Sequence, residues 1–294
     1  MGQPIDGRAV AQKVNAETSL QVERLKVNGV VPGLAVIMVG DDPASFSYVL
    51  AKEKKAQELG FKSFIYRMPP TTTQQELLEL VRSCNENAEI HGILVQSPLP
   101  VALNEHELVM AIVPEKDVDG FHPINVGLCA LGAPHALRPC TPAGIVRLLQ
   151  ECKVSTRGKR VVIIGRSRIV GLPLAHLLLQ RGEFGDATLT VCHSRTPDLG
   201  SETRRAEILI SAVGQAHLVK ADMVRPGAVV IDVGVNRVED ATKPRGYRIV
   251  GDIDYDAVLP VASFVTPVPG GVGPMTIAML MANTVQACRT QTGL

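Results

Sequence analysis

The sequence has 294 residues, of which 46% are hydrophobic and 20% are charged, and its formal net charge at pH 7 is +1. This length and composition predict a folded chain with room for two domains, and they exclude a disordered protein. With scattered Lys and Arg, no secretory signal at the start and no apolar stretch long enough for a bilayer, we expect a cytoplasmic protein that binds neither nucleic acid nor membrane.

The first part of the chain alternates helices with apolar strands. Helices are predicted at 6–26, 42–59, 73–87 and 104–112, and strands at 32–40, 62–68 and 92–96. The strongest helix start is Asp42-Pro43, an acidic N-cap followed by proline at the first helical position. Strands that alternate with helices in this way pair in parallel, so this part predicts an α/β layer.

The second part of the chain follows a connector. Residues 114–142 are rich in Pro, Gly and His and have weak periodicity, which is typical of a segment between domains. After it, strands are predicted at 161–165, 187–193, 208–213, 228–233 and 263–268, and helices after Thr141-Pro142, around Pro173 and at 274–290. This is the pattern of a doubly wound, dinucleotide-type domain.

The stretch Val161–Pro173 is the centre of that second part. Its β-branched strand ends at Gly165, and a polar turn then leads into a helix, whose N-terminus favours an anion such as a pyrophosphate. Five residues separate Gly165 from Gly171, however, so the spacing is not G-x-G-x-x-G. The stretch alone is equally consistent with a nucleotide site and with an ordinary strand–helix turn.

The residues after the next strand bear on the choice of cofactor. Domains that prefer NAD place Asp or Glu there to bind the ribose 2′-hydroxyl, whereas this chain has Ser194 and Arg195. A hydroxyl and a cation suit a 2′-phosphate, and Arg166 adds a second cation. If the domain binds a dinucleotide, the sequence favours NADP.

One lysine lies on the apolar side of its predicted helix. On a helical wheel Lys52 falls in the sector of Val49, Ala56 and Leu59, with Tyr48 one turn earlier. Either the lysine stem packs while its ammonium reaches water, or the amine is partly desolvated and able to transfer a proton. The spacing alone favours the first interpretation.

Other polar residues also allow two interpretations. Gln96 ends an apolar strand, where it either caps the Pro-rich loop or points into a ligand crevice. Asp117 and Asp119 either form turns, which the spacing favours, or bind a polar heterocycle. His193 and His217 lack the partners of a catalytic triad, and the chain shows no metal-type spacing, so we expect them to be structural and expect no metal.

The loop before the last helix is unusually rich in Pro and Gly. It reads Pro267-Val-Pro-Gly-Gly-Val-Gly-Pro274. Prolines fix the backbone, and glycines allow a ligand to approach it closely. We therefore expect this loop to line a cleft between domains, although a tight loop before a helix is the simpler alternative.

Six motifs together resemble the bifunctional methylenetetrahydrofolate dehydrogenase/methenyltetrahydrofolate cyclohydrolase family over nearly the whole chain. The motifs are Tyr48-Val-Leu-Ala-Lys52, Gly92-Ile-Leu-Val-Gln96-Ser-Pro-Leu-Pro100, Lys116-Asp-Val-Asp-Gly-Phe-His-Pro-Ile-Asn125, Pro139-Cys-Thr-Pro142, Gly165-Arg-Ser-Arg-Ile-Val-Gly171 and Pro267-Val-Pro-Gly-Gly-Val-Gly-Pro-Met-Thr276. The resemblance implies an α/β fold of two parallel-sheet lobes, the second a Rossmann-type domain, with a folate cleft between them. The first lobe would comprise 1–118 and 274–294 and the second 140–270, with connectors at 119–139 and 271–273.

The resemblance also implies an activity and a site. A cytoplasmic homodimer would oxidise 5,10-methylenetetrahydrofolate with NADP⁺ and hydrolyse the methenyl product to 10-formyltetrahydrofolate. In the implied catalytic set, Tyr48 packs on the aminobenzoyl group, Asp119 hydrogen-bonds the pterin, and Gln96 tunes Lys52. Further substrate contacts are expected from Pro267, Pro269, Gly270, Gly271, Val272 and Gly273, and cofactor contacts from Gly165, Arg166, Ser167, Ser194, Arg195 and Val235.

The chain departs from the family pattern at three positions. Ser97 stands where the family often has Leu, Ala216 replaces Pro, and Val235 replaces Ile beside the expected nicotinamide. None of these positions belongs to the implied catalytic set. Two alternatives remain open at this point: a dehydrogenase with little cyclohydrolase activity, and a folate- or nucleotide-binding module without catalysis.

Overall fold

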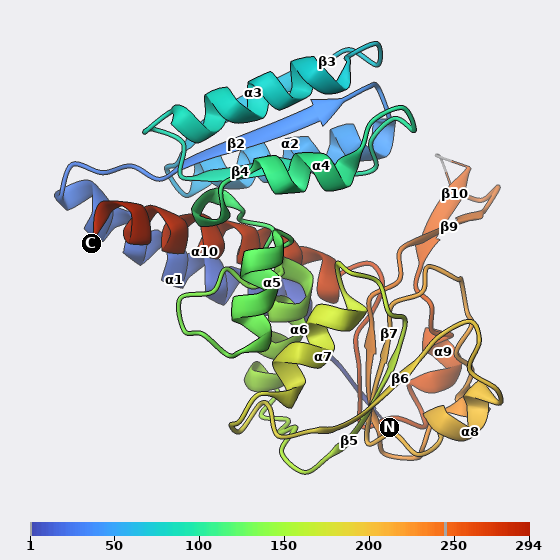
Figure 1. Cartoon of the computed structure of the whole chain (residues 1–294). Helices are drawn as coiled ribbons and strands as arrows, with labels where there is room; N and C mark the ends of the chain where they lie inside the picture. Colours follow the sequence, from blue (N-terminus) through green and yellow to red (C-terminus); the bar gives the residue numbers. More distant parts are fainter. Residues whose placement is uncertain (1, 244–245) are drawn as a thin grey trace. The chain divides into compact units, whose positions relative to one another are not determined.

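The computed structural model describes residues 2–243 and 246–294 (Figure 1). The chain forms two compact units, which we name by their sheets. The three-stranded unit comprises Gln12–Cys129, Ala133–Cys140 and Ile277–Leu294. The six-stranded unit comprises the described residues up to Ala11 together with Ala130–Gly132 and Thr141–Thr276. Among the described residues, no helix has the length and apolar character needed to cross a membrane.

The three-stranded unit is built on a parallel sheet of order β3-β2-β4. Its strands are β2 (Gly33–Val39), β3 (Lys62–Met68) and β4 (Gly92–Val95), and the intervening helices are α2 (Pro43–Glu58), α3 (Gln74–Glu86) and α4 (Glu105–Ala111). The predicted elements of this part are confirmed. Asp42 caps α2 as expected, because its side chain accepts a hydrogen bond from the N–H of Ser45 at 2.7 Å.

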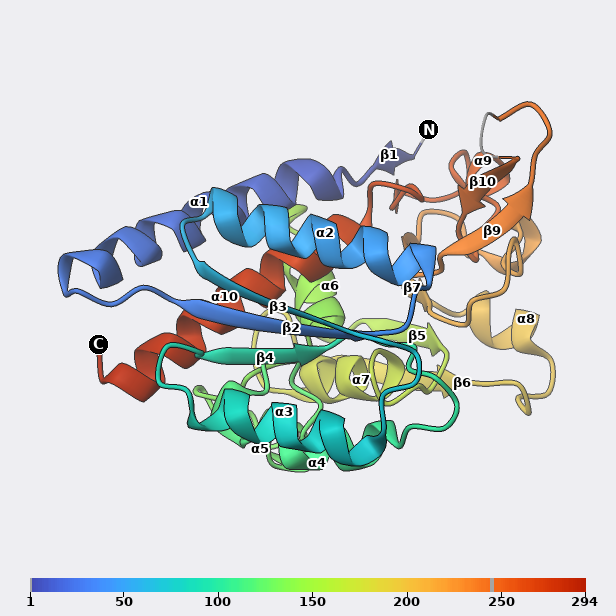
Figure 2. The same cartoon turned by 90° about the horizontal axis from the view of Figure 1, so that it is seen from above.

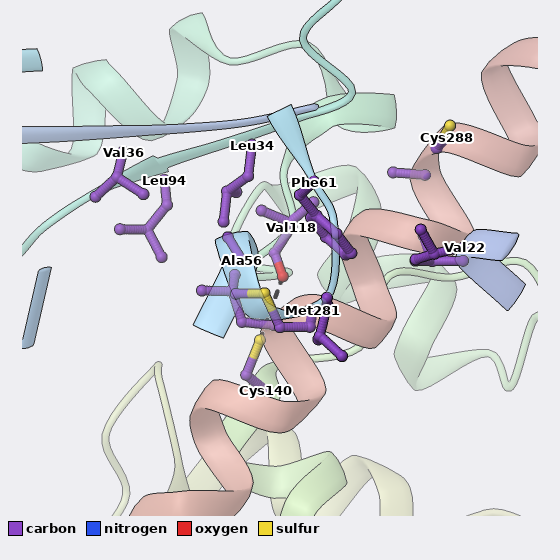
Figure 3. Packing of buried hydrophobic residues seen from close by; sticks show 14 of the residues in the cluster. Val22, Leu34, Val36, Ala56, Phe61, Leu94, Val118, Cys140, Met281 and Cys288 are labelled. Atoms are coloured by element: carbon purple, nitrogen blue, oxygen red, sulfur yellow. Dashed lines mark hydrogen bonds between the residues drawn. The ribbon is translucent and has the colours of Figure 1, made fainter. Parts of the chain in front are cut away.

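Helices cover both faces of this sheet (Figure 2). The residues of β2 are all buried and alternate between two cores. Leu34 and Val36 pack with α2 and with residues of α1 (Gly7–Val27) and α10 (Val272–Thr292), as Figure 3 shows from close by. Ala35 and Ile37 pack with α3 and α4 on the other face. This double burial explains the continuous apolar run of the strand.

The six-stranded unit carries a fully parallel sheet of order β1-β11-β8-β7-β5-β6. The strands expected here are β5 (Arg160–Ile164), β6 (Thr188–Cys192), β7 (Ile208–Ser211), β8 (Val229–Asp232) and β11 (Phe264–Val265). Helices α6 (Cys140–Glu151) and α7 (Gly171–Leu179) lie on one face, and α8 (Leu199–Thr203) and α9 (Tyr255–Val258) on the other (Figure 1). The expected doubly wound arrangement is thus confirmed, and the order of the strands reverses between β5 and β7.

Three elements lie outside the predicted pattern. The short strand β1 (Gln3–Pro4) pairs with β11, so the first residues join the six-stranded unit, whereas we expected them in the first lobe. Helix α5 (Pro123–Ala130) lies in the segment expected to be a connector. An antiparallel hairpin, β9 (Asn236–Glu239) and β10 (Tyr247–Val250), follows β8. Two-residue strands and eight-residue helices are too short for a periodicity to stand out.

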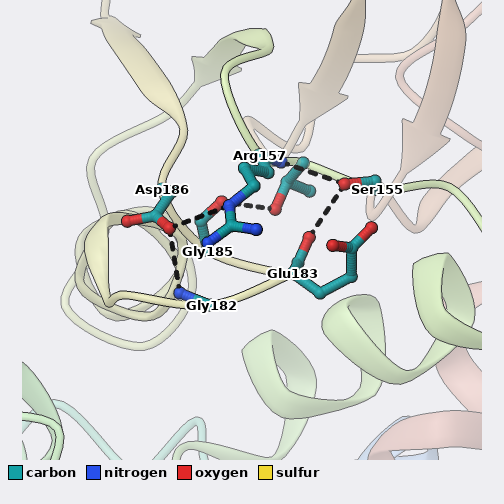
Figure 4. Close-up of polar contacts among 7 residues, drawn as sticks. Ser155, Arg157, Gly182, Glu183, Gly185 and Asp186 are labelled. Carbon is teal, nitrogen blue, oxygen red and sulfur yellow. Dashed lines mark hydrogen bonds and ion pairs between the residues drawn. The ribbon is translucent and has the colours of Figure 1, made fainter.

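Polar contacts at the amino ends of β5 and β6 join two loops of the six-stranded unit (Figure 4). The Asp186 carboxylate accepts from Gly182 N–H at 3.1 Å and from Arg157 Nε at 3.4 Å. Ser155 Oγ donates to Glu183 O at 3.0 Å. Because ligands of doubly wound sheets bind at the carboxyl ends of strands, these contacts brace the opposite end of the sheet.

Candidate functional site

A buried lysine lies at the carboxyl end of the three-stranded sheet. Lys52 is only 8% exposed, and its Nζ donates to Gln96 Oε1 at 2.8 Å. Gln96 directly follows β4, and its own N–H donates to Ile37 O on β2 at 2.8 Å, which fixes the glutamine to the sheet. Sequence spacing favoured an ammonium that reaches water, and that interpretation is wrong, because the amine is held inside the unit by a residue from another element.

Burial and the neighbouring charges together set the protonation state of Lys52. Burial lowers the pKa of the Lys52 amine, and the nearby carboxylate of Asp119 opposes part of that shift. Burial in turn raises the pKa of Asp119 to about 6, although the lysine pulls it down. The pKa of the Cys140 thiol is raised well above its usual range, again chiefly by burial, so Cys140 is a neutral neighbour. The site therefore holds an amine that gives up its proton more readily than an exposed lysine does.

Tyr48 differs from the other members of the implied catalytic set in its exposure. It lies one turn before Lys52 on α2, and its side chain is 44% exposed. Its exposed ring provides an aromatic surface that a planar ligand group can stack on. Ser97, the departure next to Gln96, hydrogen-bonds through its Oγ to the carboxylate of Glu105 at the start of α4.

Neighbouring charged residues in the same motif are structural. The Asp117 carboxylate is buried and accepts hydrogen bonds from the N–H groups of Phe121 and His122 and from Asn125 Nδ2, at 3.2, 2.8 and 2.9 Å. Lys116 Nζ donates to three backbone carbonyls at the end of α3, where a cation complements the helix dipole. Asp117 is therefore the turn former that its spacing indicates, and it leaves Asp119 as the carboxylate next to Lys52.

Replacing Asp119 with asparagine is expected to stabilise the protein at alkaline pH. The pKa of Asp119 in the folded protein, about 6, lies above its ordinary value of 3.8. The contribution of Asp119 to the free energy of unfolding is therefore full below pH 3.8 and is lost as the pH rises through 6. Asp119→Asn should therefore raise the free energy of unfolding by about 1–3 kcal/mol near pH 8 and change it little near pH 4. Urea unfolding at the two pH values measures the difference.

Asp117→Asn is the matched control. Burial raises the pKa of Asp117 as well, but its carboxylate accepts three hydrogen bonds that oppose this shift. Losing those bonds should lower the free energy of unfolding by about 1–3 kcal/mol. A destabilised Asp119→Asn variant near pH 8 would contradict the assignment of Asp119 as a carboxylate whose charged form is disfavoured by burial.

The six-stranded unit forms a tight turn between β5 and α7. Gly165 has φ +115°, and a Cβ there would lie 2.3 Å from Ala212 O. A Cβ on Gly171 would lie 2.1 Å from Gly165 O, so the start of the helix packs directly on the end of the strand. Ser167 Oγ accepts from the N–H groups of Val170 and Gly171 at 3.2 and 3.4 Å and so ties the turn to the start of the helix. The five residues between Gly165 and Gly171 therefore form a strand–helix turn that leaves the N-terminus of α7 accessible to a ligand.

The residues around this turn fit the phosphates of NADP. Arg166, Ser194 and Arg195 are all exposed, and the turn after β6 is shaped by His193, whose Nδ1 accepts from Arg195 N–H at 3.1 Å. His193 is thus structural, as expected. A hydroxyl and two cations next to a helix N-terminus suit a phosphorylated dinucleotide. Val235 follows β8 and is 54% exposed, so its side chain is accessible to a ligand.

The Pro- and Gly-rich loop closes on itself. Gly271 N–H donates to Pro267 O at 2.8 Å, and Gly270 has φ +114°. Pro269 and Gly273 are exposed, whereas Val272, the first residue of α10, is 3% exposed. The loop therefore offers backbone and proline, and not the valine side chain, to a ligand.

Fold and site together define a class of protein: a two-unit α/β dehydrogenase that also carries a buried lysine held by a glutamine. The comparison with known families is specific. The family model "Tetrahydrofolate dehydrogenase/cyclohydrolase, catalytic domain" matches residues 5–119, and the model of the "NAD(P)-binding domain" of the same family matches residues 139–292. The chain belongs to the tetrahydrofolate dehydrogenase/cyclohydrolase family.

Individual relatives agree with this assignment. The chain is 54% identical to the bifunctional protein FolD of Desulfovibrio desulfuricans over 98% of this chain and 99% of the relative. Among solved structures, the bifunctional enzyme FolD from Campylobacter jejuni is 45% identical with a TM-score of 0.93, covering 99% of both chains. The methylenetetrahydrofolate dehydrogenase-cyclohydrolase of Trypanosoma brucei, solved with NADP cofactor and inhibitor, is 40% identical with a TM-score of 0.94, covering 100% of this chain and 99% of that one.

Proposed function

We propose that this chain oxidises 5,10-methylenetetrahydrofolate to the methenyl compound with NADP⁺ and hydrolyses that compound to 10-formyltetrahydrofolate. The observation that carries the proposal is the buried Lys52 amine, held by Gln96 at 2.8 Å, in a chain that both domain models of the family match. A lysine with a lowered pKa suits hydrolysis, which needs proton transfer. The full set of Tyr48, Lys52, Gln96 and Asp119 argues against a binding module without catalysis.

In the hydrolytic step Lys52 handles the protons. A water molecule adds to the methenyl carbon and loses one proton to the neutral Lys52 amine. The ammonium then returns that proton to N5 as the bond between that nitrogen and the carbon breaks. The new hydroxyl loses its remaining proton to solvent and becomes the carbonyl of the formyl group on N10. Because Gln96 Oε1 accepts one N–H of the amine, it fixes the direction in which the remaining donors and the lone pair point.

The two other residues of the set bind substrate. Asp119 accepts hydrogen bonds from the pterin, and the exposed ring of Tyr48 packs on the aminobenzoyl group. The Asp119 carboxylate also stabilises the charged form of Lys52, which links binding to the protonation of the amine. The folate cleft between the two lobes, the homodimer and the cytoplasmic location remain predictions.

In the oxidation step the six-stranded unit binds the cofactor. Bound NADP⁺ would supply the acceptor for the hydride that leaves the methylene carbon. The turn at Gly165 and the start of α7 would hold the pyrophosphate, and Arg166, Ser194 and Arg195 would hold the 2′-phosphate. Hydride transfer asks little of side chains beyond apposing the two rings.

A steady-state assay tests the proposal. The purified protein is given methylenetetrahydrofolate with NADP⁺ or NAD⁺, and formation of reduced cofactor and of the methenyl compound is followed by absorbance. We expect NADPH to form and the methenyl compound to disappear faster than it does in a control where only non-enzymatic hydrolysis removes it. Accumulation would indicate a dehydrogenase with little cyclohydrolase activity, and no reduced cofactor would disprove the oxidation.

The preference for NADP⁺ over NAD⁺ is expected to depend on Arg166 and Ser194. Arg166→Ala and Ser194→Ala should each lower the ratio of kcat/KM for NADP⁺ to kcat/KM for NAD⁺ by about 10- to 100-fold. Each substitution removes a charge-assisted contact to the 2′-phosphate. Arg181→Ala, an exposed arginine near the amino end of β6, serves as the control and should leave the ratio unchanged. Equal use of both cofactors by the unmodified protein would contradict this prediction.

A further inference from the structure

Two aspartates with no assigned role are buried in the six-stranded unit. Asp232 ends β8 and is 2% exposed, and Asp252 follows β10 and is fully buried. The hairpin β9–β10 lies between them in sequence, so the two residues close its base. A buried carboxylate is retained only where donors satisfy it, so each of these must be accounted for.

Asp232 fixes the backbone that carries the second aspartate. Its Oδ1 accepts from the N–H groups of Gly234 and Asp252, both at 2.9 Å, and its Oδ2 accepts from Ile253 N–H at 2.9 Å. A Cβ on Gly251 would lie 1.8 Å from Asp232 Oδ2, so the chain passes directly over the carboxylate. Asp232 thereby sets the position of Asp252.

Asp252 joins two loops at the carboxyl ends of neighbouring strands. Its oxygens accept from three consecutive backbone N–H groups after β7, those of Val213 at 2.8 Å, Gly214 at 3.3 Å and Gln215 at 2.9 Å. They also accept from Asn236 Nδ2 at 3.1 Å, at the start of β9 where the loop after β8 ends, and from Ser211 Oγ at 3.2 Å. One carboxylate therefore determines how both loops are held.

These loops present apolar side chains to solvent next to the nucleotide turn. Val213 is 38% exposed and Val235 is 54% exposed, and each lies in a loop tied to Asp252. The loop after β7 begins at Ala212, whose carbonyl oxygen approaches Gly165 closely, at the switch point where doubly wound sheets bind ligands. Two exposed valines held at fixed positions suit packing against the flat face of a ring.

We propose that Asp252 is a positioning residue for the nicotinamide half of the dinucleotide, acting through the loops after β7 and β8. It touches neither substrate nor cofactor. The inference rests on the proposed function, since it requires that NADP binds this unit. It differs from the role of Arg166 and Ser194, which concerns the adenosine half with its 2′-phosphate.

Binding of two ligands to Asp252→Asn tests the proposal. The asparagine amide cannot accept all of these hydrogen bonds, so affinity for NADP⁺ should fall by about 10- to 100-fold. Affinity for 2′,5′-ADP, which lacks the nicotinamide, should differ from that of the unmodified protein by no more than about twofold. A change of about tenfold would correspond to the loss of one hydrogen bond to a charged group. Hydrogen exchange of the amides at 213–215 should accelerate without any ligand. Equal weakening of both ligands, or of neither, would overturn the proposal.

Two further variants keep the test decisive if Asp252→Asn fails to fold. Asn236→Ala cuts only the tie to the loop after β8 and should weaken NADP⁺ binding by a smaller factor, again sparing 2′,5′-ADP. Glu239→Ala changes an exposed residue of β9 and serves as the control, so it should leave both affinities unchanged. No selective effect of Asn236→Ala would also overturn the proposal. Failure of the unmodified protein to bind either ligand would instead disprove the proposed function.

Discussion

Replacing Lys52 with alanine is expected to lower the rate of methenyltetrahydrofolate hydrolysis by about 10² to 10⁴-fold, the usual contribution of a positioned acid–base group. Lys52 is the buried amine that Gln96 holds, and alanine leaves nothing there to carry the proton. Measurable NADPH formation should remain, because hydride transfer depends chiefly on apposing the two rings. The two activities of the same preparation, measured side by side, check the expectation.

Two variants separate proton transfer from packing. Lys52→Met keeps most of the apolar stem and should lose hydrolysis as fully as alanine does. Lys54→Ala removes a lysine of the same helix whose side chain is 79% exposed, and it should change neither activity. In the unmodified protein the hydrolysis rate should rise with pH and level off below the ordinary lysine pKa of 10.5, because burial lowers the pKa of Lys52. Hydrolysis at the normal rate by Lys52→Ala would show that the assigned role is wrong.

The elements that the sequence predicted well are those with a strong local pattern. Strand β2 is apolar throughout because helices cover both of its faces, and helix α2 begins where Asp42 and Pro43 indicate. Strand β1 was missed, because its two residues owe their structure to pairing with β11, far away in sequence. Local pattern thus gave the order of the elements, whereas pairing over long distances remained hidden.

The same limit applies to the candidate site. Helical spacing placed Lys52 on the apolar side of α2 but could not supply its partner Gln96, which is 44 residues away. Asp117 and Asp119 have the same local signal, and only the fold separates the turn former from the neighbour of Lys52. The motifs did bring these residues together, through resemblance and not through spacing. Asp252 lacked even that signal, because its donors come from separate segments.

Gly165→Ala is expected to abolish the dehydrogenase activity by distorting the turn before α7. The substitution forces an L-residue to φ +115° and places its Cβ 2.3 Å from a backbone oxygen, that of Ala212. Backbone strain and overpacking together should lower the free energy of unfolding by about 2–6 kcal/mol. The turn can relieve the clash only by moving away from β7, which displaces the N–H groups that would hold the pyrophosphate. Cofactor titration and urea unfolding measure the two effects.

A second glycine of the same unit isolates the steric part of that argument. Gly158 also has a positive φ, +69°, but a Cβ there would meet nothing within 4 Å. Gly158→Ala should therefore cost only about 1 kcal/mol and leave NADP⁺ binding intact. If both variants lose stability equally, backbone conformation and not close packing determines the need for glycine at Gly165. If Gly165→Ala binds NADP⁺ normally, the turn does not hold the cofactor, and the hydride acceptor must be sought elsewhere in the unit.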